Sequence, residues 1–403
     1  MLMYALSRWT FRNTIARSKY RTQVHKRSAC SRVHVSMALK TGIVGLPNVG
    51  KSTLFNALVE NSVAEAQNFP FCTIEPNFGI VNVPDDRLDV LANISDTEKI
   101  VPATVEFVDI AGLVKGAAEG QGLGNKFLSN IRECDALVHV VRCFEDSDII
   151  HVDGSVDAQR DISVINFELI LSDLSQLERA LERTSKGRGK LQNVDAKIDL
   201  YRRLTKVLEA GNPARTMELS KEGAIILSEL NLLTMKPCIY AANVNEHDLR
   251  DQGSNNSHLE KLLEIAKAEG AGVVLVSAQL ESEIMQLEKN ERSEFLEEVG
   301  ITRSGLECLI KATYDQLGLQ TYFTTGKRET RAWTIKRGFT APQAAGVIHS
   351  DFERGFIKCE TVAFDDFVAA KGYSGAKEAG LWRLEGKDYV VQEGDVLLFK
   401  FNV

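Results

Sequence analysis

One stretch decides the class of fold: Gly45-Leu46-Pro47-Asn48-Val49-Gly50-Lys51-Ser52-Thr53. It fits the pattern G-x-x-x-x-G-K-[ST], the phosphate-binding loop of nucleotide hydrolases. The residues from Ala38 to Val44 read as a short buried strand, and those from Thr53 to Val59 read as the start of a helix. A strand, a glycine loop and a helix N-terminus place backbone N–H groups and a positive dipole end around one anion. We therefore expect this stretch to bind nucleotide phosphates, the alternative being a chance match in a loop.

Two hydroxyls are candidates for contact with a magnesium ion. Lys51 would reach the β- and γ-phosphates, and the Ser52 hydroxyl beside it would ligate Mg²⁺. Further along, Pro70 and Pro76 enforce an extended loop around Thr73. Nucleotide switches order a loop of this kind through contacts with the γ-phosphate and Mg²⁺. Thr73 would supply the second hydroxyl, although a threonine in an ordinary loop remains the alternative.

A strand-terminal acid follows. Val101 to Ile110 reads as one apolar strand with Asp109 at its carboxyl end, and Gly112 completes an Asp-x-x-Gly element. In such an element the carboxylate holds a Mg²⁺ water and the glycine amide meets the γ-phosphate. The pattern is weak by itself, but its position at a strand end after Lys51 strengthens it. Ras-like hydrolases next carry a glutamine that orients the attacking water, whereas this chain has Leu113, which can neither donate nor accept a hydrogen bond.

Two histidines lie in the part of the chain that could supply the missing water-positioning role. His139 lies inside the apolar run from Ala136 to Phe144, so we expect it in the core. His151 lies in a polar stretch that could form a loop over the nucleotide, which makes it the better candidate for a general base or water-orienting group.

Two further predicted strands end in residues that would surround the base, at Asn243-Val244-Asn245-Glu246 and at Ser277-Ala278. In GTPases these strand ends carry Asn-Lys-x-Asp and Ser-Ala, and the aspartate accepts two hydrogen bonds from guanine. Here Val244 replaces the lysine, and the neutral amide of Asn245 lies next to Glu246. A binding site whose polar groups are placed to hydrogen-bond one group of a ligand loses much affinity for a ligand that lacks that group. The departure therefore favours ATP over GTP, with a backbone carbonyl near Val244 accepting from the adenine 6-amino group.

The chain changes character at two places. Residues 165–228 carry apolar residues at helical spacing around a turn at Thr184 to Lys190, which predicts an antiparallel helical hairpin. Its basic tip, Lys186, Arg188 and Lys190, would contact RNA or simply be solvated. Residues 319–403 read as a small mixed β domain, either a binding module or a structural cap. We therefore expect a nucleotide-binding α/β domain over 37–318 with the inserted hairpin, followed by the small domain.

Composition and charge narrow the class of protein. With 44% hydrophobic and 26% charged residues the chain is typical of globular proteins, and no apolar run approaches the roughly 20 residues of a membrane span. Its seven cysteines form no C-x-x-C pair, which fits a reducing compartment. Residues 1–36 carry eight Arg or Lys and no acid, and without them the formal net charge falls from −7 to −15. Such a segment is typical of an organelle transit peptide, with a basic RNA-binding arm as the alternative.

These stretches together resemble the Obg-like ATPases, the YchF-type branch of the Obg family of translation-factor-related proteins. The resemblance covers Leu39 to Val403, and its other specific stretches are Asn68 to Asn77, Phe107 to Gly116, Gly120 to Asn125, Ala332 to Ile335 and Ala341 to Ala345. It implies a P-loop nucleotide hydrolase domain with an inserted α-helical hairpin, then an α+β ubiquitin-like β-grasp domain of the TGS type. It also implies an ATPase with Mg²⁺ as cofactor, slow hydrolysis used as a switch in translation or stress response, and ribosomes as partner.

The resemblance also assigns roles to individual residues. The phosphate site would comprise Asn48, Val49, Gly50, Lys51, Ser52 and Thr53. The metal site would comprise Ser52 and Thr73, and the catalytic groups would be Lys51, Asp109, Gly112 and His151. The base site would comprise Asn243, Val244, Ser277 and Ala278. Asn48 also matches an asparagine with which relatives help hold a potassium ion, which can stand in for an arginine finger.

Alternatives remain for both function and location. The chain could be a GTPase translation factor, or a nucleotide-regulated ribosome-binding adaptor in which turnover is irrelevant. The body looks similar to cyanobacterial members of the family, so we expect a plastid location, with the mitochondrion next and the cytoplasm as the alternative to an organelle.

Overall fold

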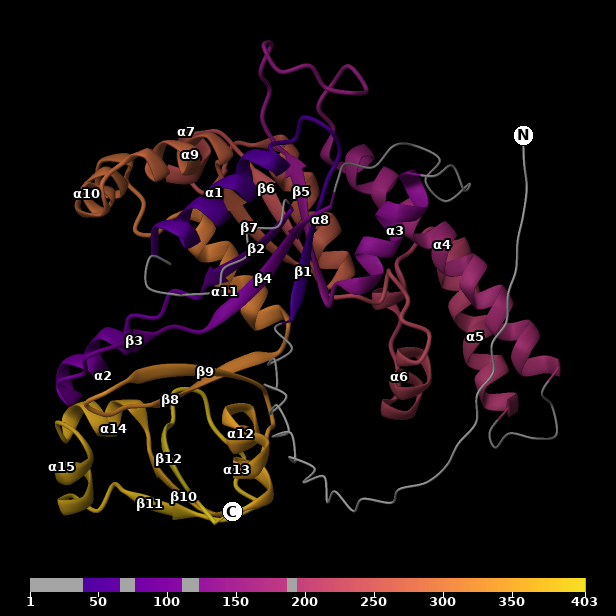
Figure 1. Cartoon of the computed structure of the whole chain (residues 1–403). Coiled ribbons are helices and arrows are strands. Elements are labelled where there is room, and N and C mark those ends of the chain that lie inside the picture. The colour runs from indigo at the N-terminus through magenta and orange to yellow at the C-terminus, as the bar shows by residue number, and fades with distance from the viewer. Residues whose placement is uncertain (1–38, 66–76, 111–122, 187–193, 403) are drawn as a thin grey trace, which may run out of the picture. The chain divides into compact units, whose positions relative to one another are not determined.

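The computed structural model describes residues 39–65, 77–110, 123–186 and 194–402 (Figure 1). Two six-stranded sheets organise these residues. The first has the order β2-β4-β1-β5-β6-β7, and only β2 runs antiparallel to its neighbour. Its strands are β1 (Lys40–Val44), β2 (Phe78–Asn82), β4 (Thr104–Asp109), β5 (Ala136–Arg142), β6 (Cys238–Asn243) and β7 (Gly272–Val276). Parallel strands place their carboxyl ends at one edge of the sheet, where ligands of open α/β sheets bind.

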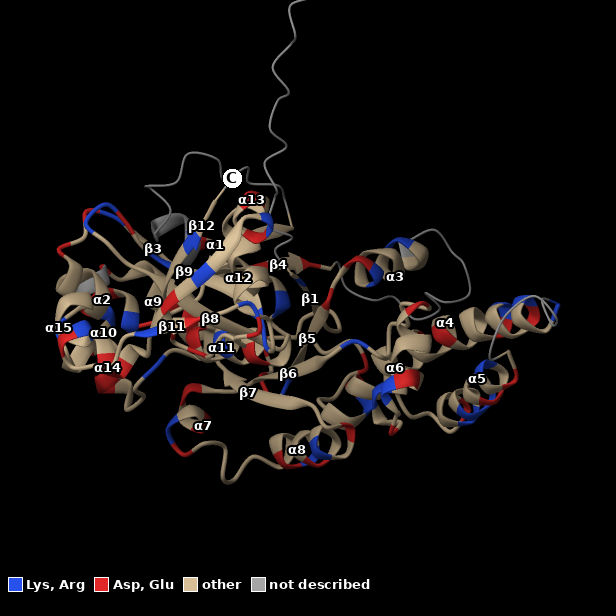
Figure 2. Ribbon diagram, turned by 90° about the horizontal axis from the view of Figure 1, so that it is seen from below, with Lys and Arg blue, Asp and Glu red and all other residues tan. Residues whose placement is uncertain are grey.

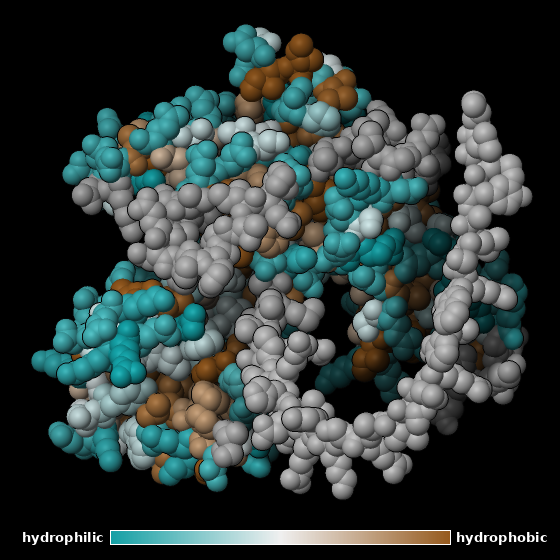
Figure 3. Space-filling model, viewed as in Figure 1, coloured by the Kyte–Doolittle hydropathy of each residue, from teal (hydrophilic) through white to brown (hydrophobic). Residues whose placement is uncertain are grey.

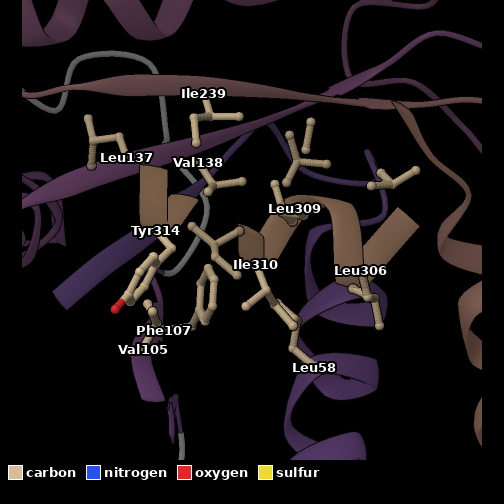
Figure 4. Close-up of a cluster of buried hydrophobic side chains, with 14 of the residues drawn as sticks. Leu58, Val105, Phe107, Leu137, Val138, Ile239, Leu306, Leu309, Ile310 and Tyr314 are labelled. Carbon is tan, nitrogen blue, oxygen red and sulfur yellow. The ribbon is translucent and has the colours of Figure 1, made fainter. Parts of the chain in front are cut away.

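Helices cover both faces of this sheet. One face packs against α1 (Lys51–Glu65) and α11 (Gly305–Gln316), and the other packs against α3 (Leu123–Glu133), α4 (Ala158–Lys186) and α8 (Ser257–Glu269). Figure 4 shows how the apolar side of α11 meets the strands in the core. The side chains drawn there include Leu306, Leu309, Ile310 and Tyr314 of α11 and Leu137, Val138, Ile239 and Phe107 of the sheet. Shorter helices flank the carboxyl edge: α7 (Glu246–Arg250), α9 (Ala278–Gln286) and α10 (Lys289–Val299).

The inserted hairpin is formed by α4 and α5 (Val194–Glu209), followed by the short helix η3 (Ala214–Thr216) and α6 (Lys221–Ser228). It has a small core of its own, built on residues such as Leu177, Tyr201 and Leu204. At the end of α4 the charges are mixed (Figure 2), and Lys186 lies 3.4 Å from Glu182. The other two cations of the predicted tip, Arg188 and Lys190, lie outside the described residues.

The second sheet has the order β11-β10-β12-β8-β9-β3. Its strands are β3 (Ile100–Val101), β8 (Leu319–Thr324), β9 (Thr330–Lys336), β10 (Phe356–Val362), β11 (Arg383–Glu385) and β12 (Val396–Phe401). Its helices are α12 (Ala341–Ile348), α13 (Ser350–Arg354), α14 (Phe364–Ala369) and α15 (Tyr373–Glu378). The last strand, β12, lies parallel to the first strand of the domain, β8, between the two hairpins, which is the arrangement of a β-grasp fold. The predicted fold class is therefore confirmed.

One detail of the sequence reading was wrong. The apolar run from Val101 to Ile110 is not one strand, because Pro102 lies between β3 and β4 and cannot donate to a ladder. β3 instead pairs with β9 in the second sheet, so the segment predicted to belong wholly to the nucleotide domain contributes a strand to the other sheet.

The helix α2 (Arg87–Ser95) precedes β3 and was not predicted. Its first residue, Arg87, forms ion pairs with Asp85 at 2.7 Å and with Glu393 of the β-grasp domain at 2.6 Å. Nearby, the Thr97 hydroxyl donates to the Gly326 carbonyl at 2.9 Å. The segment between β2 and β4 is therefore joined to the β-grasp domain by side-chain contacts as well as by β3. Among the helices of the described ranges, none is both long and apolar enough to cross a bilayer.

Candidate nucleotide-binding site

The phosphate loop lies between the end of β1 at Val44 and the start of α1 at Lys51, as its pattern predicts. Gly50 has a φ of 92°, which favours glycine, and a Cβ added there would collide with Nδ2 of Asn243. At the other end of the loop, a Cβ on Gly45 would lie 2.8 Å from the carbonyl oxygen of Val140. The loop is therefore a close-fitting backbone turn into a helix N-terminus, and both glycines are required by contact with neighbouring strands.

Lys51 and Asp109 meet in this site. The Lys51 Nζ lies 2.7 Å from Asp109 Oδ1, and the two side chains are 9% and 12% exposed. The pairing register places Asp109 beside Ile43 at the carboxyl ends of adjacent parallel strands, which brings the acid to the phosphate loop. A cation and a carboxylate in this arrangement suit a phosphate and a hydrated divalent ion, respectively.

The hydroxyls of the site are only partly described. Ser52 and Thr53 lie exposed in the first turn of α1, directly after Lys51. Thr73, Gly112 and Leu113 lie outside the described residues, so their predicted roles stay predictions. Ser52 and Asp109 together offer a hydroxyl and a carboxylate oxygen, which are the donors that Mg²⁺ prefers. The donor set that is described therefore fits a magnesium ion.

Asn243 connects the phosphate loop to the base side of the site. Its Nδ2 donates to the Val49 carbonyl at 2.9 Å, and its Oδ1 accepts from the Ala278 N–H at 3.0 Å. The residue is 3% exposed, at the end of β6. A single buried amide thus fixes the glycine loop to the start of α9.

Val244 and Ser277 also lie at this edge. The Val244 side chain is 2% exposed and packs in the core, and its N–H donates to the Val276 carbonyl at 2.8 Å. Ser277 is buried and caps α9 by accepting from the Leu280 N–H at 3.4 Å. The buried Val244 side chain therefore does not cover a base in the way that the stem of a lysine would.

Glu246 is the residue that the sequence reasoning weighted too little. Counting from Asn243, the aspartate of Asn-Lys-x-Asp falls on Glu246 rather than on Asn245. Glu246 begins α7, and its Oε1 accepts from Arg250 Nη2 at 2.7 Å across one turn. Asn245 is exposed at the N-cap position and makes no side-chain capping bond. The signal was present in the spacing, because the pattern fixes the acid three residues after the asparagine.

His151 is held inside its own loop. Its Nε2 lies 2.9 Å from Asp161 Oδ2, and its Nδ1 accepts from the Asp153 N–H at 3.2 Å and from Arg160 Nη2 at 3.4 Å. Since Nδ1 faces donors, the proton lies on Nε2 and is donated to Asp161. The side chain is only 3% exposed. To orient a water at a phosphate, the imidazole would have to leave these partners.

The loop that carries His151 nevertheless touches the phosphate loop. Asn48 has a φ of 61°, and its Nδ2 donates to the carbonyl of Ile150 at 3.1 Å.

His139, by contrast, is buried in β5, and burial together with the nearby Arg215 lowers its pKa to about 3. His139 is therefore neutral in the core, as expected from the sequence.

A phosphate loop whose lysine meets a strand-end aspartate, on a sheet of this order, defines a P-loop nucleotide hydrolase of the GTPase type. Residues 40–172 match the family model described as "50S ribosome-binding GTPase", and residues 319–402 match YchF-GTPase_C, described as "Protein of unknown function (DUF933)". The chain belongs to the YchF family, which confirms the resemblance drawn from its motifs.

The similarity to individual relatives extends over nearly the whole chain. The "Ribosome-binding ATPase YchF" of Pasteurella multocida is 56% identical over 369 residues, which are 91% of this chain and 100% of the relative. The Bacillus subtilis protein of the same name is 54% identical with the same coverage. The solved structure of the Schizosaccharomyces pombe YchF GTPase has a TM-score of 0.81 and 38% identity, covering 90% of this chain and 97% of that one.

Proposed function

We propose that this chain is a Mg²⁺-dependent ATPase that prefers ATP to GTP and acts as a slow nucleotide switch on the ribosome. The observation that supports nucleotide turnover best is the Lys51–Asp109 pair at the mouth of the glycine loop. Binding of a triphosphate offers Lys51 phosphate oxygens in place of the carboxylate. Magnesium, when bound, neutralises charge on the β- and γ-phosphate oxygens. Ser52 and Asp109 would hold it, together with Thr73, and Gly112 would contact the γ-phosphate.

ATP preference is supported by the base side of the site. Val244 is packed in the core, and the Glu246 carboxylate has Arg250 as a partner across one turn of α7. Guanine would need that carboxylate to face its N–H donors, so binding GTP competes with the Arg250 pair. Adenine lacks the 2-amino donor and needs only an acceptor for its 6-amino group, which a backbone carbonyl near Val244 supplies.

The deciding experiment compares ATP with GTP. Fluorescent analogues of both are titrated against residues 37–403 with Mg²⁺, and the double variant Val244→Lys with Glu246→Asp serves as the comparison. We expect at least about tenfold tighter ATP binding, equivalent to about 1.4 kcal/mol, and a shift towards GTP in the variant. A tenfold preference of the unmodified chain for GTP would instead support a GTPase translation factor.

Slow turnover is supported by the confinement of His151 and by Leu113, which removes the usual water-orienting glutamine. His151→Ala should lower the turnover rate without changing ATP affinity, because the imidazole is proposed to act on the attacking water only. Potassium is proposed to assist through Asn48, so replacing K⁺ by Na⁺ should lower the rate as well. An unaffected rate in the alanine variant would remove His151 from the catalytic groups.

A second function is favoured by the same confinement of His151. If the ring stays with Asp161, the chain could serve as an adaptor that binds ribosomes in response to nucleotide, with turnover irrelevant. Both readings take the ribosome as partner, a proposal supported by the name of the relatives. The adaptor is preferred if Lys51→Ala abolishes ribosome association while a turnover-deficient His151→Ala variant acts normally in cells.

A further inference from the structure

The loop between β5 and α4, residues 143–157, carries exposed aliphatic side chains beside the phosphate loop. Ile149, Ile150 and Val152 are 38%, 79% and 57% exposed, within four consecutive positions. In Figure 1 this magenta loop projects from the carboxyl edge of the first sheet, and Figure 3 shows a brown, apolar patch at the same place. Single exposed aliphatic residues are ordinary, but a cluster of them on a projecting loop marks an interaction site.

This loop is held in its shape from inside. Arg142 is fully buried, and its guanidinium donates to the carbonyls of Phe144, Asp146 and Ile149 at 3.0 to 3.1 Å. The guanidinium also lies over the Phe144 ring, 4.7 Å from its centroid. The hydrogen bonds from this buried arginine to the loop carbonyls fix the backbone that presents the aliphatic side chains.

Two further contacts fix the next residues of the loop. The Asn48 amide donates to the Ile150 carbonyl at 3.1 Å, and His151 is tied to Asp161 at 2.9 Å. The main chain is therefore braced on both sides of Ile150 while its side chain faces solvent. A preorganised surface loses little conformational entropy when a partner covers it.

The charge of the loop selects the kind of partner. Residues 143–157 contain five acids and no Lys or Arg. Glu145, Asp146 and Asp148 are exposed directly before the aliphatic residues. Carboxylates at the rim would repel the phosphates of RNA, whereas they would attract a protein surface bearing lysine or arginine. An apolar centre with a charged rim is the usual anatomy of a protein interface.

We propose that the β5–α4 loop is the contact through which this chain docks on a basic protein of the ribosome, with Ile150 and Val152 as the apolar anchors. The proposal rests on the ribosome association proposed above and adds which surface makes it and to what chemistry. Because Asn48 of the phosphate loop donates to the Ile150 carbonyl, a partner bound to the β5–α4 loop would contact a residue that is hydrogen-bonded to the phosphate loop.

The test measures cosedimentation of the full chain with purified bacterial 70S ribosomes at increasing salt. Ile150→Ser with Val152→Ser should weaken binding about tenfold or more, since it removes the aliphatic anchors. Ile225→Ser is the matched control, because Ile225 is 67% exposed on α6 and lies outside the loop. Unchanged thermal unfolding of both variants would show that folding is intact, as expected for exposed side chains.

Charge and partner class are tested separately. Glu145→Gln with Asp148→Asn should weaken binding at low salt and flatten its salt dependence, while neutralising the exposed acids Glu294 and Glu298 of α10 should not. A benzophenone photo-crosslinker introduced at position 152 should label a basic ribosomal protein.

Three results would overturn the inference. The first is a crosslink from position 152 to ribosomal RNA, and the second is equal binding by the serine double variant and the unmodified chain. In both cases the proposed ribosome association itself would stand. The third is no sedimentation of the unmodified chain with ribosomes, which would overturn the docking proposal and the ribosomal part of the function together, while the preference for ATP is decided by its own titration.

Discussion

Replacing Asn243 by alanine should destabilise the fold and the phosphate loop together. The change removes two hydrogen bonds, at 2.9 and 3.0 Å, from a side chain that is 3% exposed. It leaves the Val49 carbonyl and the Ala278 N–H without that partner. An unsatisfied buried backbone group costs about 1–3 kcal/mol, so with two such groups the free energy of unfolding should fall by about 2–6 kcal/mol. ATP affinity should fall as well, because the glycine loop loses its connection to α9.

The assay is urea unfolding of residues 37–403 without nucleotide, followed by ATP titration. Asn245→Ala is the matched control, because Asn245 is exposed and makes no side-chain capping bond. Surface changes of that kind stay within about 0.5 kcal/mol. If Asn243→Ala lost no more stability than the control, the buried amide would not connect the glycine loop to α9 as described. Equal ATP affinity in the two variants would show that the Asn243 amide stabilises the fold without supporting nucleotide binding.

Three other outcomes are expected. Burial raises the pKa of Glu281 from 4.5 to about 7, so between these values the folded state holds a proton that the unfolded state has lost. Stability should therefore fall as pH rises from about 4.5 to 7, by at most about 3 kcal/mol, and pH-dependent urea unfolding of Glu281→Gln should show a smaller fall. Asp109→Asn should remove most of the Mg²⁺ dependence of ATP affinity, measured by titration with and without Mg²⁺, and an unchanged dependence would exclude the carboxylate as a holder of the ion. Residues 1–36 fused to a fluorescent protein should direct it to an organelle, and replacing their eight cations by glutamine should leave it in the cytosol.

The sequence predicted the phosphate loop well because its requirements are local. Glycines, a lysine and a helix start within nine residues carry the whole pattern, and the structure places Lys51 where a strand-end acid meets it. Asn243 and Ser277 were likewise found at strand ends, where periodicity identifies the strand and the motif identifies the residue.

What the sequence could not predict depends on contacts between distant segments. The run from Val101 to Ile110 looked like one strand, since nothing local shows that Val101 pairs with Arg331 in another sheet. The same holds for His151, whose polar neighbours suggested an accessible loop. Its confinement comes from contacts with Asp161 and Arg160 of the following helix, and no pattern in the loop sequence predicts these contacts.

The pairing of β3 with β9 has a practical consequence for dissecting this protein. A chain that ends at residue 318 would lack β9, so Ile100 and Val101 would lose their sheet and Arg87 would lose Glu393. Only Pro102 and Ala103 separate that orphaned strand from β4, which ends in Asp109. Deleting the carboxyl-terminal domain would thus disturb the segment that positions an acid of the nucleotide site, and a loss of turnover in such a truncation would not identify what the deleted domain does. Point variants within the intact chain are the sounder way to separate the two domains.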